Sequence, residues 1–138
     1  MSSNITIRRK SSHATRRHNF APNISASEGE FGWLCIDDKV VGCIALRELH
    51  PADHSGEIKR MYVQPAYRKL GIAQALLSAL ESFAARAGYK WLYLDSAAGM
   101  DTAIRFYQKN DYDPCPRYND NPQAIIFLCK GLAQAAEL

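Results

Sequence analysis

The fold of this chain is decided by the stretch RMYVQPAYRKLGIA at residues 60–73, where a strand-like segment passes through a short loop into a helix. Residues 57–63 (EIKRMYV) have the composition of a strand, and the dipeptide Gln64-Pro65 would end it. Over residues 70–87 the apolar side chains fall on one stripe at helical spacing, and Gly88 follows where a left-handed cap residue is expected. The stretch therefore predicts a strand–loop–helix unit.

The start of this helix has the composition of an anion-binding site. A helix N-terminus carries free N–H groups and about half a positive charge, which together suit a phosphate. Gly71 would let the backbone approach an anion without a Cβ in the way, and Arg68 and Lys69 add two positive charges. Neither GxxxxGK nor GxGxxG is present. Spacing alone leaves two interpretations open: a phosphate site, or an ordinary helix start with solvated basic residues.

Strand and helix patterns alternate along the rest of the chain. Before residues 57–63, residues 31–36 and 40–48 predict a hairpin. After the long helix, a strand is predicted at residues 89–94, a helix at residues 101–109 and a last strand at residues 124–130. Asn110 can end the second helix because it tolerates a positive φ. The strand–helix–strand unit over residues 57–94 implies a right-handed crossover. We therefore predict an α/β fold with a mixed sheet flanked by helices.

Length and charge bound the class of protein. A chain of 138 residues is about one domain, and no apolar run reaches the roughly 18 residues of a membrane span. Residues 1–20 hold five basic residues and no acidic one, whereas residues 21–138 hold 12 basic and 14 acidic residues. The charge of residues 21–138 therefore argues against a basic nucleic-acid-binding surface there, and nucleic-acid binding would have to rest on the N-terminal segment. Residues 1–30 predict a basic, polar N-terminal segment with a short first strand at residues 4–9 or, alternatively, an organelle transit peptide.

The cysteines and histidines indicate neither a disulfide framework nor a metal site. No CxxC motif is present, and His50 and His54 are spaced i, i+4 in a loop-like segment rather than on a predicted helix. No signal-peptide pattern stands near the start. We therefore expect reduced thiols in a cytoplasmic protein without a metal, the thiols being Cys35, Cys43, Cys115 and Cys129.

Three short motifs stand in the order in which a known family carries them. Residues 68–73 (RKLGIA) fit the pattern R/Q-x-x-G-x-G/A, and MYV and QPAYR at residues 61–68 precede it. Residues 106–112 (FYQKNDY) are similar to the family's FYxKxGF, with Asn110 in place of glycine. Over residues 31–130 the chain thus resembles the GNAT family of N-acetyltransferases. The resemblance implies a single GNAT-like domain at residues 31–138.

The resemblance also implies acetyl-CoA as the cosubstrate. In that family the start of the helix holds the pyrophosphate, at positions that are here Arg68, Lys69, Leu70, Gly71, Ile72 and Ala73. The backbone of the preceding strand pairs with the pantetheine arm, at positions that are here Met61, Tyr62 and Val63. In that family the two central parallel strands splay apart to admit the cofactor, and the resemblance implies the same here for residues 57–63 and 89–94.

Two residues are candidates for catalysis of acetyl transfer to a primary amine by direct attack. An amine with a pKa near 10.4 costs about 4–5 kcal/mol to hold neutral at pH 7, so a base or a desolvating site is needed. Glu57 is the candidate base, with a solvated strand-end charge paired with Lys59 as its alternative. Tyr107 matches the family's general-acid tyrosine, and its alternative is a packed core aromatic. Residues 118–122 (YNDNP) predict either a pocket wall or a simple turn.

The chain departs from the family pattern near its N-terminus and after the fourth-motif strand. Family members carry two helices between the first strand and the hairpin, whereas residues 10–30 show no helical stripe. We expect the acceptor wall to be missing, shortened or supplied by a second subunit, and hence a homodimer. Residues 95–100 (DSAAGM) offer no counterpart to an Asn that contacts the cofactor in relatives. The alternative function is a catalytically weak relative that binds acyl-CoA.

Overall fold

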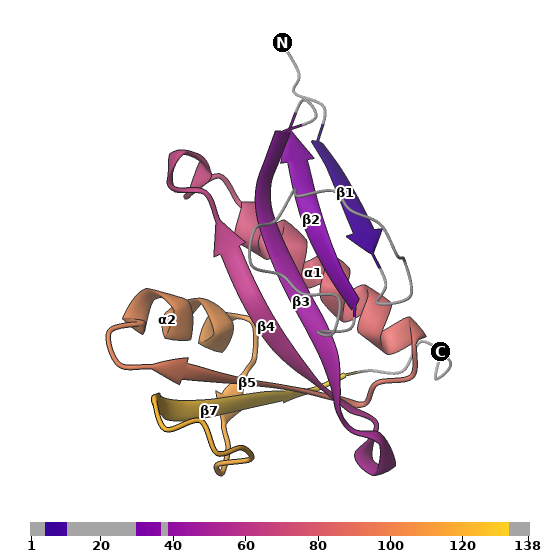
Figure 1. Ribbon diagram of the computed structural model, residues 1–138, viewed down its shortest axis with the longest axis vertical. Helices are drawn as coiled ribbons and strands as arrows, with labels where there is room; N and C mark the ends of the chain where they lie inside the picture. The colour runs from indigo at the N-terminus through magenta and orange to yellow at the C-terminus, as the bar shows by residue number, and fades with distance from the viewer. Residues whose placement is uncertain (1–4, 11–29, 37–38, 133–138) are drawn as a thin grey trace.

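The computed structural model of the chain describes residues 5–10, 30–36 and 39–132. Its elements form one seven-stranded sheet in the order β1-β2-β3-β4-β5-β7-β6, with two helices (Figure 1). The strands are β1 (Ile5–Lys10), β2 (Glu30–Ile36), β3 (Lys39–His50), β4 (Ser55–Val63), β5 (Trp91–Ala97), β6 (Asp113–Pro114) and β7 (Ala124–Gly131). The helices are α1 (Ile72–Arg86) and α2 (Asp101–Lys109), and two 3-10 turns are η2 (Pro51–Asp53) and η3 (Pro65–Tyr67).

The predicted mixed α/β architecture is confirmed. Every neighbouring pair of strands is antiparallel except β4 and β5, which are parallel and joined through α1. The strand expected at residues 4–9 corresponds to β1, which pairs with β2 and so belongs to the same sheet. The expected absence of helices before the hairpin falls largely on residues 11–29, which lie outside the described residues.

The core forms between α1 and the sheet. The helix buries one face, Ile72, Leu76, Leu77, Leu80 and Ala84, because these residues recur at the spacing of one helical stripe. They pack in one cluster with Ile44 and Leu46 of β3, Ile58 of β4 and Leu92 and Leu94 of β5. In Figure 1, α1 lies behind the strands. Side chains of β3 and β4 that point away from α1 therefore lie on the other face of the sheet, outside this core.

The ends of the helices follow the sequence with one difference. Gly88 has a φ of 96°, as expected of a residue that closes α1. After α2, Asn110 is the C-cap, as predicted, but its φ of −99° shows that it ends the helix without the positive φ that it would tolerate. Asp111 takes the left-handed conformation instead, with a φ of 72°. Asp, like Asn, tolerates the left-handed region because its short polar side chain can hydrogen-bond to the nearby backbone.

The sheet opens in its middle, between β4 and β5. The two strands pair over three residue pairs, Ser55 with Trp91, Gly56 with Leu92 and Glu57 with Tyr93, and then diverge (Figure 1). The register of β3 on β4 explains the divergence. From Cys43 to Ala45 the partner on β4 changes from Tyr62 to Lys59, so β4 holds one extra residue. A bulge of this kind bends the strand that carries it, and here β4 leaves β5 just beyond Glu57.

Among the described residues, no helix combines the length and the apolar character that a membrane crossing requires.

Candidate functional site

The loop after β4 is fixed so that α1 begins close to the end of the strand. The Gln64 amide N–H donates to the Val41 carbonyl at 2.8 Å, and its side-chain Nε2 donates to the Val40 carbonyl at 2.6 Å. The turn η3 follows, and the Arg68 N–H donates to the Pro65 carbonyl at 3.3 Å. These bonds tie the loop to β3 and hold the start of α1 beside the open edge of β4.

Gly71 gives the start of α1 its anion-binding character. It is the N-cap of α1 with a φ of 80° and a ψ of 10°, a conformation that most L-residues rarely adopt. A Cβ placed on Gly71 would meet no atom within 4 Å, so the space in front of this backbone is open. The first N–H bonded back along the chain is that of Ala75, which donates to the Gly71 carbonyl at 3.0 Å. The amides of Ile72 and Ala73 are therefore free of intrahelical partners.

The side chains predicted at the loop contribute in different ways. Arg68 Nε donates to the Val63 carbonyl at 3.0 Å, and its guanidinium lies 5.8 Å from the centre of the Tyr62 ring. Lys69 is exposed and has a φ of 66°, and Leu70 is 65% exposed. Ile72 is buried in the core, so only its backbone can face a ligand. The structure thus brings Tyr62, Val63 and residues 68–73 together, and Met61, half-buried, packs against the core.

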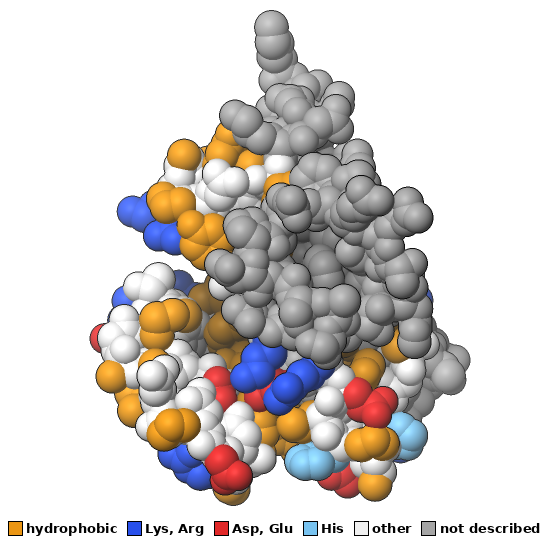
Figure 2. Space-filling view, in the orientation of Figure 1, with side chains coloured by type: hydrophobic (Ala, Val, Ile, Leu, Met, Phe, Trp, Pro, Cys, Tyr) orange, Lys and Arg blue, Asp and Glu red, His pale blue; other side chains and the backbone are white. Residues whose placement is uncertain are grey.

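A stretch of β4 lies open between this loop and the short β4–β5 ladder. Ile58 to Val63 extend beyond the last parallel pair, over roughly 20 Å of strand. Figure 2 shows the surface hollowed on this side of the molecule, with hydrophobic side chains on the rim and in the floor. An extended ligand could therefore lie along β4 as an additional strand would.

Tyr107 lies in the last turn of α2, and burial raises the pKa of its phenol well above the usual value. Its ring packs edge-on against those of Phe106 and Tyr112, with centroids 5.2 and 5.5 Å away. Asn110 fixes this turn, since its Nδ2 donates to the Phe106 carbonyl at 2.9 Å and its Oδ1 accepts from Gln74 Nε2 of α1 at 2.8 Å. The Tyr107 hydroxyl stays protonated and makes no hydrogen bond to another described residue. It is available as a donor.

Glu57 lies at the fork where β4 and β5 separate, and its side chain is fully buried. The expectation of a solvated strand-end charge is therefore wrong, whereas the pairing with Lys59 is present, with Nζ 3.4 Å from Oε2. Arg47, its partner in the register of β3 on β4, directs Nε and Nη2 to Oε1 at 3.0 and 2.9 Å. Burying a carboxylate demands such partners.

The loop before β7 completes the surroundings of Glu57. The Tyr118 hydroxyl donates to Glu57 Oε2 at 2.6 Å, and Asn119 Nδ2 donates to the same oxygen at 3.2 Å. Asn119 also reaches Asp95 Oδ2 of β5 at 2.7 Å. Burial and the Glu57 carboxylate raise the pKa of Tyr118 well above its usual value, so this phenol remains a donor.

The turn predicted for residues 118–122 is present, whereas their role as a pocket wall stays a prediction. Asn121 N–H donates to Asn119 Oδ1 at 3.0 Å and Gln123 N–H to Asn121 Oδ1 at 3.1 Å, which are the self-bonding turns that Asn favours. The same turns direct Tyr118 and Asn119 toward Glu57. Neither Arg47 nor Asp95 is among the residues predicted for the site from the sequence. The hairpin register could have shown Arg47, because it pairs Arg47 with Glu57.

Among the described residues, no cysteine contacts Glu57 or Tyr107 in the bonds given above, and no group of metal-ligating side chains is found. Cys115 and Cys129 are free thiols, and burial together with Cys129 raises the pKa of Cys115 to about 12. Within residues 5–10, 30–36 and 39–132, no three His, Cys, Asp or Glu side chains gather in a way that could hold a metal ion.

Comparisons with known proteins agree with this geometry. A sequence model of the acetyltransferase (GNAT) family matches residues 5–112, so the match includes β1 and begins before the region of resemblance noted above. A protein of Azospirillum brasilense named IAA acetyltransferase is 35% identical over 90 residues, which are 63% of this chain and 58% of that protein. A protein of Schizosaccharomyces pombe named as an uncharacterized N-acetyltransferase is 30% identical over 84 residues, 59% of this chain and 50% of that protein. The matches thus span about half the length of these curated relatives.

Solved structures share the fold over most of the chain. A GNAT family acetyltransferase of Elizabethkingia anophelis with acetyl-CoA bound has a TM-score of 0.73 at 19% identity, over 94% of this chain and 99% of that one. The IAA acetyltransferase of Bacillus cereus has a TM-score of 0.72 at 17% identity, over 94% and 100%. At these identities the likeness shows the fold alone. With the family match over residues 5–112, the chain belongs to the GNAT acetyltransferase family.

Proposed function

We propose that this chain is an acetyl-CoA-dependent N-acetyltransferase, an acyltransferase that moves the acetyl group to a primary amine of a small molecule or peptide by direct attack. One observation carries the proposal: the open edge of β4 runs from the anion-binding start of α1 to the buried carboxylate of Glu57. A cofactor with an anionic end and an extended arm could lie along this edge of β4. Its reacting group would then lie near the point where β4 and β5 separate.

The cofactor would be held mainly by backbone groups. Its pyrophosphate would accept from the amides of residues 71–73, with the charges of Arg68 and Lys69 beside it. Its pantetheine arm would pair with β4 at Met61, Tyr62 and Val63. These contacts use backbone N–H and C=O groups, so they do not depend on which side chains the exposed loop positions carry.

Acetyl transfer would then need a base for the amine proton and a hydrogen-bond donor for the departing thiolate. The amine nitrogen attacks the thioester carbonyl, a C–N bond forms, and the C–S bond breaks as the carbonyl re-forms. Glu57 would take the amine proton directly or through a water molecule, and Tyr107 would donate a hydrogen bond to the departing thiolate. Since the pKa of Tyr107 is raised above 10 and a thiol has a pKa near 8.5, stabilisation by the hydrogen bond outweighs full transfer.

One observation favours a second candidate, a catalytically weak relative that binds acyl-CoA. Both oxygens of Glu57 are engaged, Oε1 by Arg47 and Oε2 by Tyr118, Asn119 and Lys59. A base in this position must first exchange one of these partners. Lys59 has the longest contact and a side chain that is 31% exposed, so we expect it to be the partner that gives way.

A thiol-release assay over a panel of primary amines, run beside calorimetry with acetyl-CoA, tests the proposal. Amine-dependent release of free CoA supports the transferase. Tight acetyl-CoA binding without release for any amine supports the weak relative. Absence of acetyl-CoA binding to the folded chain would refute both functions.

The cytoplasmic location, the boundary at residue 30 and the homodimer stay predictions. Sedimentation of the purified chain tests the homodimer, and a monomer at all concentrations would contradict it.

A further inference from the structure

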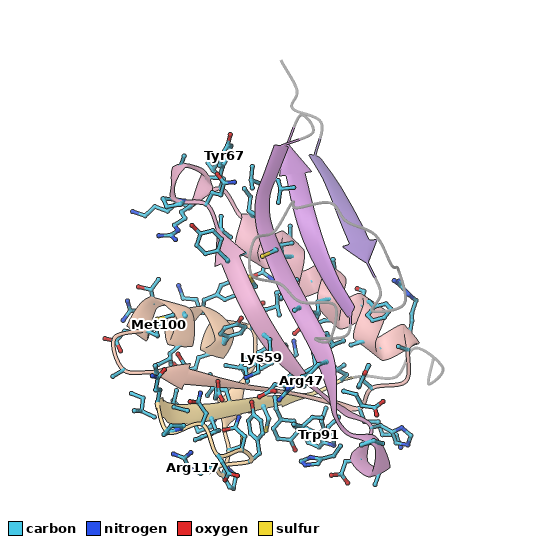
Figure 3. The ribbon with its side chains drawn as sticks, in the orientation of Figure 1. Arg47, Lys59, Tyr67, Trp91, Met100 and Arg117 are labelled. Atoms are coloured by element: carbon cyan, nitrogen blue, oxygen red, sulfur yellow. The ribbon has the colours of Figure 1, made fainter. Side chains whose placement is uncertain are left out.

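We infer that the acceptor is an amine that also carries an anionic group, a carboxylate or a phosphate, and that Arg47 and Lys59 bind this group. The inference rests on the proposed function and names its acceptor class. Figure 3 shows Arg47 and Lys59 as neighbours over the middle of the sheet, and Figure 2 shows basic side chains gathered there beside acidic ones.

The two cations lie on the same face of the sheet as Glu57. Leu46 and Ile58 point into the core against α1, and side chains alternate along a strand, so Arg47, Glu57 and Lys59 face the other way. Glu48, which follows Arg47 on β3, alternates away from this face. Two positive charges therefore stand beside one fully buried carboxylate.

Both cations keep donors that the described residues do not use. Arg47 directs Nε and one Nη2 hydrogen to Glu57, which leaves three of the five N–H groups of a guanidinium. Lys59 makes one contact, which leaves two of its three. The two side chains are 47% and 31% exposed, so these donors can reach a ligand in solution.

A second acidic side chain on this face, that of Asp95, does not neutralise the second cation. Asp95 Oδ2 accepts from Asn119 Nδ2 at 2.7 Å and from Asn121 Nδ2 at 3.3 Å, and no ion pair links it to Arg47 or Lys59. An anionic group brought by a ligand would balance the second cation. The amine of the same ligand would then lie near the carboxylates of Glu57 and Asp95.

Aromatic rings form a wall beside these charges. The rings of Tyr93 and Tyr118 lie with their centroids 5.1 Å apart, and Phe127 lies 5.4 Å from Tyr118. The wall suits the carbon skeleton between an amine and an anionic group. It also excludes water from the hydrogen bond of Tyr118 to Glu57, which strengthens that bond.

Paired amines with and without the anionic group, compared at equal concentrations of the unprotonated amine, test the inference. Alanine against alaninamide examines a carboxylate, and phosphoethanolamine against ethanolamine examines a phosphate. The measured quantity is the ratio of kcat/KM for the anionic amine to that for its neutral partner, at fixed salt. We expect a ratio of roughly ten or more for one pair, as hydrogen bonds to charged groups give.

Lys59→Gln is expected to lower this ratio by roughly tenfold, since it removes one cation without removing the Arg47 contacts to Glu57. Lys90→Gln is the matched control, because Lys90 is exposed and lies before β5, at the opposite end of that strand from the opening. Arg47→Lys keeps the charge and loses the fork, so a smaller fall is expected. Equal rates for the paired amines in the wild type, or an unchanged ratio in Lys59→Gln, would overturn the inference.

Failure of the proposed function is distinguishable from failure of this inference. If no amine is acetylated, calorimetry of the same four compounds on CoA-loaded protein decides the matter. Tighter binding of an anionic amine than of its neutral partner, lost in Lys59→Gln, supports the inference without turnover. Equal binding within each pair contradicts it.

Discussion

Gly71 combines a left-handed backbone with open space in front of it. Substitutions at this position can therefore separate the effect of an added side chain on cofactor binding from the effect of an added charge. Asp and Asn both tolerate a positive φ, and neither side chain would meet a neighbouring atom at its Cβ. Gly71→Asn and Gly71→Asp therefore have similar strain, and they differ by one negative charge where the pyrophosphate is expected.

We expect Gly71→Asp to weaken acetyl-CoA binding by roughly a hundredfold and Gly71→Asn by a much smaller factor, because the added carboxylate would lie within a few ångströms of the anionic pyrophosphate and repel it. Calorimetry with acetyl-CoA measures both affinities, and circular dichroism checks that both variants fold. Equal affinities in the two variants would show that the anion binds elsewhere.

Tyr107 offers a cleaner test of catalysis than Glu57 does, because its hydroxyl makes no hydrogen bond to another described residue. Tyr107→Phe should lower the rate of acetyl transfer by roughly tenfold or more and leave the affinity for acetyl-CoA within a few-fold, as a transition-state contact implies. Steady-state kinetics and calorimetry provide the two numbers. A variant that retains the wild-type rate would remove Tyr107 from the mechanism.

At the scale of the elements, the short parallel ladder of β4 on β5 joins the two halves of the sheet. Gly56 lies in the middle of this ladder. A Cβ on Gly56 would lie 2.7 Å from Leu46 Cδ1 and 3.2 Å from Tyr89 Cε1, and Leu46 is a buried core residue. The ladder therefore has no room for a side chain at its centre.

Gly56→Ala should lower the free energy of unfolding by about 1–3 kcal/mol through overpacking. Gly131→Ala is the matched control, since its nearest atoms belong to the ring of exposed Trp91, 3.3 Å away, which can move. Urea denaturation compares the two variants. A loss as large in Gly131→Ala as in Gly56→Ala would contradict the role given to the ladder.

For the whole molecule, burial of several tyrosines makes stability depend on alkaline pH. The pKa values of Tyr93, Tyr107, Tyr112 and Tyr118 are all raised in the folded chain, with burial as the largest cause, whereas an unfolded tyrosine ionises near 10. Below pH 10 both states hold these protons. Above it the unfolded state loses them first, so unfolding becomes more favourable as pH rises.

We therefore expect the contribution of these tyrosines to the free energy of unfolding to be constant below pH 10 and to fall above it, by up to about 1.4 kcal/mol per pH unit for buried Tyr107 and by less for Tyr93, which is partly exposed. Urea titrations at increasing pH measure the slope, and Tyr107→Phe should reduce it by removing one of the four groups. A slope that is unchanged in Tyr107→Phe would show that Tyr107 ionises in the folded state.

Local patterns predicted most of the fold, and long-range contacts account for what they missed. The predicted helix at residues 101–109 has the bounds of α2, and the longer helix predicted at residues 70–87 begins two residues later and ends one residue earlier in the structure. The burial of Glu57 could not be read from its neighbours. It depends on Arg47, ten positions away in the hairpin, and on Tyr118, 61 positions away in a loop whose turns alone are local.

The open middle of the sheet has a consequence for how much folded protein a cell would contain. An edge without a partner leaves backbone groups that only solvent or a ligand can satisfy, and a ligand that binds the folded chain alone stabilises it by about 2.7 kcal/mol at a hundred times its Kd. Chains that unfold are degraded. If CoA and acetyl-CoA are the ligands, as proposed above, the abundance of this protein would rise and fall with the summed concentration of the two, because both carry the pyrophosphate and the pantetheine arm.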